Sequence, residues 1–231
     1  MELQEIEKMA ELEAEHWWFS AKRRLIVDYV SKIRKGLLLD IGCGTGENTK
    51  EFKKYHDVVS CDISRETIKF SKDKTKGKFV LADVEYLPFK DNTFGLVVAL
   101  DILEHINDDV KTIKQIHSLL KSNAKFIINV PAHMFLFNGH DILLHHKRRY
   151  VQSELKSKVI NCGFNINKLT YWNFLLFPLT IFFKIISNNS NINETNGWVN
   201  KVLYKILCID NFLIKNISLP FGVSLFCVAQ K

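Results

Sequence analysis

The 231-residue chain has an ordinary globular composition, with 47% hydrophobic and 25% charged residues. Its length favours one domain with a real core, and its composition excludes collagen-like, low-complexity and wholly disordered classes. An excess of 32 Lys plus Arg over 25 Asp plus Glu gives a net charge of +7. This basic charge permits nucleic acid, anionic lipid or a phosphorylated substrate as partner without selecting one. The aromatic fraction of 12%, with 17 Phe, is the second unusual feature.

The N-terminal segment predicts two helices of opposite charge. Residues 1–15 contain six Glu and one Lys and have one apolar side, which predicts an acidic amphipathic helix. Residues 22–35 contain six Lys or Arg and one Asp, which predicts a basic helix. The run His-Trp-Trp-Phe at 16–19 lies between them. Because two adjacent tryptophans cannot face the same side of a helix, we expect one of Trp17 and Trp18 to pack and the other to cover a ligand as a lid.

The middle of the chain alternates strand and helix patterns. Apolar strands are predicted over residues 36–40, 58–62, 78–82, 94–100 and 125–130. Helices are predicted over residues 47–55, 64–73, 110–120 and 152–162. Continuous apolar strands separated by helices indicate a parallel sheet covered on both faces. Two late strands are predicted over residues 164–172 and 222–229.

A glycine-rich turn follows the first predicted strand, with the sequence D-I-G-C-G-T-G at 40–46. Glycine lets the backbone turn tightly and approach a ligand closely. The G-x-G-x-G spacing differs from the G-x-G-x-x-G dinucleotide fingerprint, which disfavours a nicotinamide oxidoreductase. The carboxylate of Asp40 would repel a pyrophosphate but could hold a cationic ligand. The turn therefore predicts a ligand site at the end of the first strand.

Carboxylates also follow the next two predicted strands. Asp62 ends the second strand, where it can accept hydrogen bonds from both hydroxyls of a ribose. Asp83 follows the third strand, where it can accept one from an exocyclic adenine amine while Val84 packs on the ring. Each aspartate alone could serve as a helix N-cap. Acidic residues at three successive strand ends favour the ligand-binding interpretation.

These motifs together resemble the class I S-adenosylmethionine-dependent methyltransferases over about residues 36–132. The resemblance is carried by D-I-G-C-G-T-G at 40–46, C-D-I-S at 61–64, A-D-V-E-Y-L-P-F at 82–89 and D-N-T-F-G-L-V-V-A-L-D-I-L-E-H-I at 91–106. It implies an α/β fold with a Rossmann-like, seven-stranded, mostly parallel sheet, helices on both faces, an antiparallel last strand and a helical insertion before that strand. It also implies S-adenosyl-L-methionine as the cofactor. The cofactor-binding residues that it implies are Asp40, Gly42, Gly44, Gly46, Asp62, Ile63, Asp83, Val84 and Asp101.

The flanks resemble a narrower group of these enzymes, whose members are mostly known as predicted methyltransferases. The shared segments are H-W-W-F at 16–19, a His/Arg-rich segment at 140–150 and L-P-F-G-V-S-L at 219–225. We interpret residues 1–231 as a single methyltransferase domain. Its predicted parts are an N-terminal helical lid (1–35), a cofactor-binding core (36–132), an acceptor loop (133–150) and an apolar helical insertion (173–216).

Candidate catalytic residues lie on the acceptor loop, because open α/β sheets bind ligands at the carboxyl ends of their strands. Methyl transfer from a sulfonium mainly requires the nucleophile to be held near attack distance, and a hydroxyl acceptor gains from a general base. His140 and His145 are the candidate bases. The candidate substrate-binding residues are Trp17, Trp18, His105, Arg148 and Arg149, with the two arginines as a clamp for a phosphate or carboxylate.

Two other interpretations of the His/Arg-rich segment stay open. A run of this kind can be an ordinary solvated surface. His140, His145 and an acidic partner could also form a metal site, but their spacing matches no usual ligand set, so no metal is predicted.

The apolar insertion at 173–216 is the main indicator of the acceptor type. Three interpretations are open for it: a cover over the sheet and acceptor pocket, a homodimer interface, or a peripheral membrane helix near lipid-linked substrates. The polar run S-N-N-S-N-I-N-E-T-N at 187–196 predicts a loop between its two helices.

The leading function is therefore methyl transfer to a small-molecule or lipid/sugar-linked acceptor. An RNA-modifying methyltransferase is an alternative on charge, but nucleic acid is disfavoured because Asp-Ile-Leu-Glu at 101–104 stands where enzymes that methylate base amines usually carry an N/D-P-P-Y-like motif. A non-catalytic S-adenosylmethionine-binding scaffold is a second alternative. Five scattered Cys, no basic leader and no long apolar run predict a cytoplasmic protein, with peripheral membrane contact left open.

Overall fold

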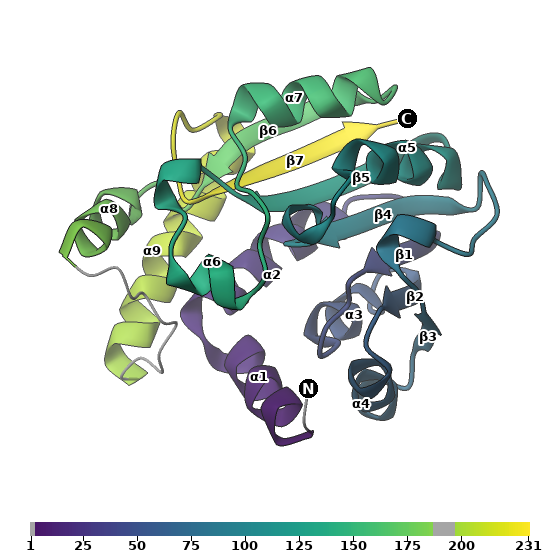
Figure 1. The fold of residues 1–231 in the computed structure, drawn as a ribbon, viewed down its shortest axis with the longest axis horizontal. Coiled ribbons are helices and arrows are strands. Elements are labelled where there is room, and N and C mark those ends of the chain that lie inside the picture. Colours follow the sequence, from purple (N-terminus) through teal and green to yellow (C-terminus); the bar gives the residue numbers. More distant parts are fainter. Residues whose placement is uncertain (1–2, 187–196) are drawn as a thin grey trace.

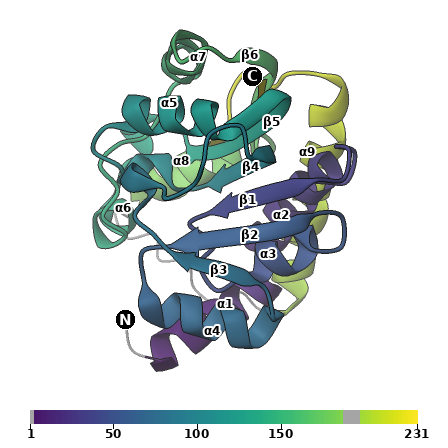
Figure 2. The same ribbon diagram turned by 90° about the vertical axis from the view of Figure 1, so that its right-hand side faces the viewer.

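The computed structural model describes residues 3–186 and 197–231, and a twisted seven-stranded sheet forms its centre (Figure 1; Figure 2). The strand order is β3-β2-β1-β4-β5-β7-β6. The strands are β1 (Leu37–Ile41), β2 (Asp57–Asp62), β3 (Lys78–Leu81), β4 (Phe94–Leu100), β5 (Leu120–Pro131), β6 (Asn165–Trp172) and β7 (Ser224–Gln230). Strands β1 to β5 pair in parallel, and β7 is antiparallel to both β5 and β6. The predicted Rossmann-like sheet with an antiparallel last strand is confirmed.

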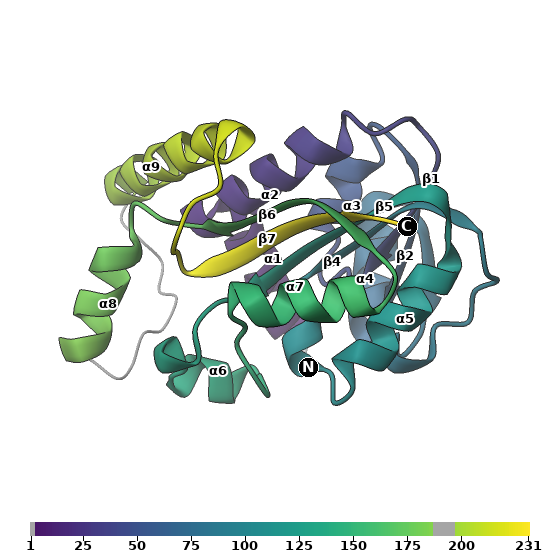
Figure 3. The ribbon, with the colours of Figure 1, turned by 90° about the horizontal axis from the view of Figure 1, so that it is seen from above.

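Helices cover both faces of this sheet. The α-helices are α1 (Leu3–Glu15), α2 (Trp17–Val30), α3 (Glu47–Phe52), α4 (Arg65–Thr75), α5 (Asp109–Leu119), α6 (Gly139–Leu143), α7 (Gln152–Asn161), α8 (Phe177–Ile186) and α9 (Gly197–Asn216). Short 3-10 turns follow three of the strands: η1 (Val84–Tyr86), η2 (Leu103–His105) and η3 (Met134–Leu136). Figure 3 shows α5 and α7 on one face and α2 and α9 on the other.

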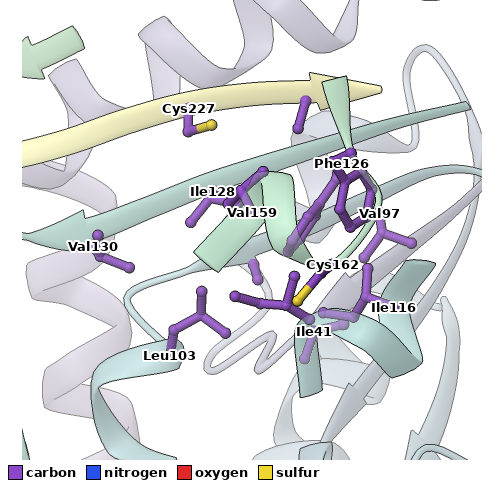
Figure 4. Close-up of a cluster of buried hydrophobic side chains, with 14 of the residues drawn as sticks. Ile41, Val97, Leu103, Ile116, Phe126, Ile128, Val130, Val159, Cys162 and Cys227 are labelled. Carbon is purple, nitrogen blue, oxygen red and sulfur yellow. The ribbon is translucent and has the colours of Figure 1, made fainter. Parts of the chain in front are cut away.

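Two hydrophobic cores follow from this arrangement, because successive residues of a strand point to opposite faces. The core under α5 and α7 is shown in Figure 4 and includes Ile41, Val97, Ile116, Phe126, Ile128 and Val159. The core under α2 and α9 includes Leu25, Leu38, Val98, Ile127, Leu207 and Phe226. Burial of both faces explains why the strands are continuous apolar runs rather than alternating ones.

The predicted start of the basic helix is wrong. Helix α2 begins at Trp17, five residues before the predicted position, so the His-Trp-Trp-Phe run forms its first turn rather than a linker. His16 caps this helix, since its Nδ1 accepts a hydrogen bond of 3.3 Å from the backbone N–H of Trp18. The charge pattern could not reveal this start, because the first turn is aromatic and the cap is a histidine rather than one of the residues usual at that position.

The apolar insertion contains α8 and α9, as predicted. Helix α9 packs against α2 and β6. Helix α8 lies beyond the ends of β6 and β7 (Figure 3). The polar run predicted as a loop at 187–196 lies outside the described residues. In the part of the chain that is described, no helix is both long and apolar enough to cross a bilayer.

A buried amide joins α9 to the rest of the protein. Trp172 Nε1 donates a 2.8 Å hydrogen bond to Asn211 Oδ1, and Asn211 Nδ2 donates one of 2.9 Å to the carbonyl of Ala21. Asn211 therefore connects β6, α9 and α2 through a single side chain.

We predict that Asn211→Ala lowers the free energy of unfolding by about 1–3 kcal/mol, because it leaves the buried indole N–H of Trp172 without an acceptor. Urea unfolding followed by circular dichroism measures the change. Asn216→Ala is the matched control, since the exposed Asn216 only donates to Phe212 on its own helix. Equal stabilities of the two variants would contradict the prediction.

Candidate active site

The glycine turn leads from β1 into α3 in a conformation that requires glycine. Gly42, Gly44 and Gly46 have φ values of 67°, 52° and 82°, all in the left-handed region. The backbone N–H of Gly42 donates a 2.8 Å hydrogen bond to the carbonyl of Cys61 at the end of β2. The turn is thus fixed against the neighbouring strand. A Cβ on Gly42 would lie 1.9 Å from Ile102 Cδ1, so the Ile102 side chain would have to move to admit one.

Asp62 holds the outer side of this turn. Its Oδ2 accepts a 3.1 Å hydrogen bond from the N–H of Gly44, and its Oδ1 accepts one of 3.0 Å from the N–H of Ser64. The carboxylate is half-buried. Asp62 therefore lies at the end of β2, beside the glycine turn, as a ribose-binding residue would.

Two more carboxylates face the same turn. Asp40 is buried, and its Oδ2 accepts a 2.6 Å hydrogen bond from Thr49 Oγ1. Burial raises the pKa of Asp40 to about 7, and the negative charges of Asp62 and Glu13 act in the same direction. Glu13 comes from α1 and accepts a hydrogen bond from the hydroxyl of Thr45. Burial raises the pKa of Glu13 as well.

The convergence of these three carboxylates has a chemical meaning. Like charges held together in a partly buried place raise each other's pKa, and an added positive charge relieves that repulsion. The glycine turn with Asp40, Asp62 and Glu13 is therefore matched to a ligand that carries positive charge. A cofactor with a sulfonium and an ammonium group fits this requirement.

Apolar side chains flank the turn on the β2–β3 side. Ile63 is 71% exposed directly after Asp62, and Val84 is half-buried in η1. Asp83 is exposed, and its Oδ1 accepts a 2.9 Å hydrogen bond from the N–H of Glu85. Asp83 thus caps η1, and an N-cap was the other interpretation of this residue besides adenine binding. The cap occupies one carboxylate oxygen.

Asp101 at the end of β4 binds polar groups of the protein itself. Its carboxylate forms an ion pair with the buried Lys22 of α2 and accepts a 2.8 Å hydrogen bond from Asn129 Nδ2. The ammonium of Lys22 also lies 5.5 Å from the ring centre of Trp18. The carboxylate of Asp101, predicted to contact the cofactor, thus already forms an ion pair with an amine of the protein.

The predicted tryptophan pair joins the lid to the insertion. Trp18 packs edge-on against Trp172 with ring centres 5.0 Å apart. The backbone N–H of Trp17 donates a 2.8 Å hydrogen bond to Asn200 Oδ1 on α9. Both indoles are half-buried, and Trp17 and Trp18 contact each other edge-on.

The two histidines predicted as bases lie on and beside α6. His140 is half-buried in the first turn of α6, and burial lowers its pKa. His145 follows the helix, is exposed, and has a φ of 57°. Both belong to the acceptor loop, which folds as η3 and α6.

The predicted arginine clamp is not supported, because both guanidinium groups bind carboxylates of the protein. Arg149 forms two 2.9 Å hydrogen bonds to Asp141, one from Nε and one from Nη2. Arg148 lies 3.2 Å from Asp109 Oδ2 and donates to the carbonyl of Asn107 at 2.9 Å. The two arginines therefore stabilise the acceptor loop.

Sequence reasoning missed Glu13 and Lys22 as parts of this site. Glu13 is one of six glutamates in an acidic helix, and Lys22 is one of six basic residues in the next. Nothing in the local pattern separates either residue from its neighbours. Only the packing of α1 and α2 on the sheet selects them.

Comparison with known proteins identifies the core of the chain. Residues 39–128 match the model of a methyltransferase domain family. A C-methyltransferase of ubiquinone and menaquinone biosynthesis, UbiE from Idiomarina loihiensis, is 31% identical over 118 residues, which are 46% of this chain and 47% of that protein. The mitochondrial arginine-hydroxylase NDUFAF5 from Homo sapiens is 39% identical over 94 residues, which are 39% of this chain and 27% of that protein.

The likeness to solved structures extends over the whole fold. The crystal structure of an S-adenosylmethionine-dependent methyltransferase from Archaeoglobus fulgidus superposes with a TM-score of 0.62 at 20% identity, covering 97% of this chain and 99% of that one. At this identity the likeness shows the fold alone. The matched segments span less than half the length of the curated relatives. Residues 39–128 thus resemble a methyltransferase domain, and the segments on either side of them lie outside the match.

Proposed function

Because residues 39–128 form a methyltransferase domain, we propose that the chain transfers the methyl group of S-adenosyl-L-methionine to a small-molecule or lipid/sugar-linked acceptor. The observation that carries this proposal is the convergence of Asp40, Asp62 and Glu13 on the glycine turn. This arrangement suits a cationic cofactor and does not suit a pyrophosphate. It distinguishes the proposal from a nicotinamide-dependent function on the same fold.

In this proposal each part of the site holds one part of the cofactor. The turn of Gly42, Gly44 and Gly46, with Asp40 and Glu13, holds the methionine end. Asp62 accepts the ribose hydroxyls, while Ile63 and Val84 contact the adenine and Asp83 its amine. When bound, the cofactor would supply an electrophilic methyl group on a sulfonium; the C–S bond breaks with its electron pair going to sulfur, so the thioether leaves without protonation.

The ion pair of Lys22 and Asp101 has a positioning role in the same proposal. It connects α2 to the end of β4, so the lid and the sheet are held together at the edge of the site. Lys22 is buried, and pairing with Asp101 satisfies its charge. The methionine amine is then left to Asp40 and Glu13 rather than to Asp101.

His140 is the better of the two candidate bases for a hydroxyl acceptor. Its pKa is lowered by burial, so the imidazole is neutral and able to accept a proton near pH 7. His145 is exposed and lies outside the helix. It is then a residue that contacts the acceptor, in keeping with its place on the loop.

An apolar or amphiphilic acceptor is favoured by the surface of the acceptor loop. Its charged arginines are used internally, whereas Phe135, Ile142 and Leu143 are 57%, 66% and 70% exposed. Large exposed apolar side chains on one loop are in keeping with a binding surface for apolar groups. This observation favours a lipid-linked or otherwise apolar acceptor over RNA.

The contacts of α8 support the interpretation of the insertion as a cover. Phe177 and Ile181 of α8 pack with Leu136 of the acceptor loop and with Trp18 of the lid. Lys184 Nζ donates a 2.6 Å hydrogen bond to the carbonyl of Phe137. Side chains of the lid, the acceptor loop and α8 thus pack in one small cluster. Phe182 and Phe183 remain exposed on α8, which is in keeping with peripheral membrane contact of a cytoplasmic enzyme.

The first prediction from this proposal concerns Asp62. Asp62→Asn removes the charge that accepts the ribose hydroxyls and should weaken S-adenosylmethionine binding by about 10- to 100-fold. Isothermal titration calorimetry measures the affinity. Asp57→Asn is the matched control, since Asp57 begins the same strand and is exposed. Unchanged affinity of Asp62→Asn would contradict the assignment of this site.

The second prediction concerns pH. A carboxyl group with a pKa of about 7 is roughly one-tenth ionised at pH 6 and roughly three-quarters ionised at pH 7.5. Because the cationic cofactor binds the ionised form of Asp40 better, its affinity should rise about 5- to 10-fold over this interval. The same titration in Asp40→Asn should show a much smaller rise. An equal slope in both proteins would exclude Asp40 as the source.

The third prediction concerns the acceptor. The protein is incubated with S-adenosylmethionine labelled in its methyl group and with a cell extract, which is then separated into organic-soluble, small aqueous, RNA and protein fractions. We expect the label in the organic-soluble fraction or in the small aqueous fraction. Label that stays in RNA and is released by ribonuclease would establish the RNA-modifying alternative. Cofactor binding without transfer to any fraction would favour the scaffold.

A further inference from the structure

A cluster of three metal-ligating side chains lies outside the cofactor site just described. Glu104 and His105 belong to η2, directly after β4, and His146 follows α6. One ligand atom from each of these residues lies within 4.8 Å of the other two. Hence a single ion could contact all three side chains.

The backbone fixes the two segments that carry this cluster. The N–H of Lys147 donates a 2.8 Å hydrogen bond to the carbonyl of Glu104, and the N–H of His146 donates one of 2.8 Å to the carbonyl of Asp141. The rings of His105 and His146 are 4.7 Å apart and nearly perpendicular. The three side chains are therefore brought together by the fold rather than by flexible surface segments.

Glu104 is the member of the cluster that requires an explanation. Its side chain is fully buried, and neither carboxylate oxygen has a hydrogen-bond partner among the described residues. His146 Nε2 lies 4.0 Å from Glu104 Oε1, which is too far for a hydrogen bond. A buried carboxylate without partners is costly, and buried charges are normally paired or bound to a metal.

The nearby cationic side chains do not supply this partner, because each is bound elsewhere. Lys22 pairs with Asp101, Arg149 pairs with Asp141, and Lys147 Nζ donates a 2.7 Å hydrogen bond to Asn107 Oδ1. The orphaned oxygens of Glu104 are thus left to a ligand from outside the chain.

His146 is oriented in the way that metal-binding histidines usually are. Its Nδ1 lies 2.8 Å from Asp141 Oδ1, while its Nε2 is the nitrogen nearer to Glu104. In metal sites a carboxylate commonly accepts the N–H of the ligating imidazole and so directs the other nitrogen at the ion. Asp141 is itself fully buried and held by Arg149 and by the cap of α6.

We propose that Glu104, His105 and His146 bind a divalent transition-metal ion of the Zn²⁺ type, with Asp141 as the residue that orients His146. Two imidazoles and one carboxylate are a ligand set that zinc uses in catalytic sites, where a further position stays open for water or substrate. The cluster lies at the carboxyl end of β4, on the side of the acceptor loop.

Direct metal binding tests this inference without reference to methyl transfer. Protein freed of metal by chelation is titrated with Zn²⁺ by calorimetry in the absence of S-adenosylmethionine. Co²⁺ replaces Zn²⁺ in a parallel titration, because its visible absorption bands report nitrogen and oxygen ligation. We expect one Zn²⁺ per chain and Co²⁺ bands that saturate at the same ratio.

Ligand variants then identify the site. Glu104→Gln and His146→Ala should each weaken Zn²⁺ binding by about 100-fold or more, since even loss of a residue that only orients a ligand costs 10- to 100-fold. His145→Asn is the matched control, because His145 adjoins His146 but is exposed and outside the cluster, and asparagine tolerates its positive φ. It should bind Zn²⁺ as the natural chain does.

Two results would overturn the proposal. One is the absence of stoichiometric Zn²⁺ and Co²⁺ binding by the natural chain. The other is a Glu104→Gln variant that folds and binds Zn²⁺ with the affinity of the natural chain. His105→Ala serves as a further ligand variant if the buried change prevents folding, since His105 is only half-buried. Circular dichroism of each variant shows which of them fold.

Discussion

Helices bury both faces of the sheet, and the carboxylates of the candidate site lie at the carboxyl ends of its parallel strands. The helices on the two faces cover the central parts of β1, β4 and β5, where buried apolar side chains such as Leu39, Val97 and Ile127 lie. The carboxylates of the candidate site gather where the strands end and the chain turns. Asp40, Asp62 and Asp101 all lie at these strand ends. Because like charges repel, each carboxylate placed there makes its neighbours harder to ionise. Other groups of the site offset this repulsion.

The balance is achieved differently for each carboxylate. Asp62 accepts hydrogen bonds from two backbone N–H groups, and Asp101 pairs with Lys22. Asp40 accepts one hydroxyl and keeps a raised pKa, with Glu13 beside it. The unbalanced part of the site is therefore the region of Asp40 and Glu13, and it is there that positive charge from a cofactor has the greatest effect. The N-terminal helices matter for function because they supply both a balancing charge and an additional negative one.

The acceptor side follows a different principle. Asp141 is the centre of a buried network. Its carboxylate accepts a hydrogen bond from the backbone N–H of Asn138, the N-cap of α6, binds Arg149 at two points and lies beside His146 Nδ1. The guanidinium groups of the loop pair with carboxylates of the protein, and apolar side chains remain exposed at the surface of the loop. The same network directs His146 toward Glu104, where a buried carboxylate lacks a partner among the described residues.

The sequence by itself determined the sheet, the positions of its apolar strands along the chain, and the glycine turn with aspartates at the ends of neighbouring strands. These features depend on local patterns: continuous apolar runs, glycines at positive φ, and aspartates directly after strands. Tertiary structure alone decided which charges meet. The arginine clamp was predicted from two adjacent residues, but these arginines form ion pairs with Asp109 and Asp141. Glu13, Lys22 and the cluster at Glu104 come from segments far apart along the chain, and no periodicity reports a contact between such segments. Electrostatic pairing acts through space, so only the packed fold could assign these residues.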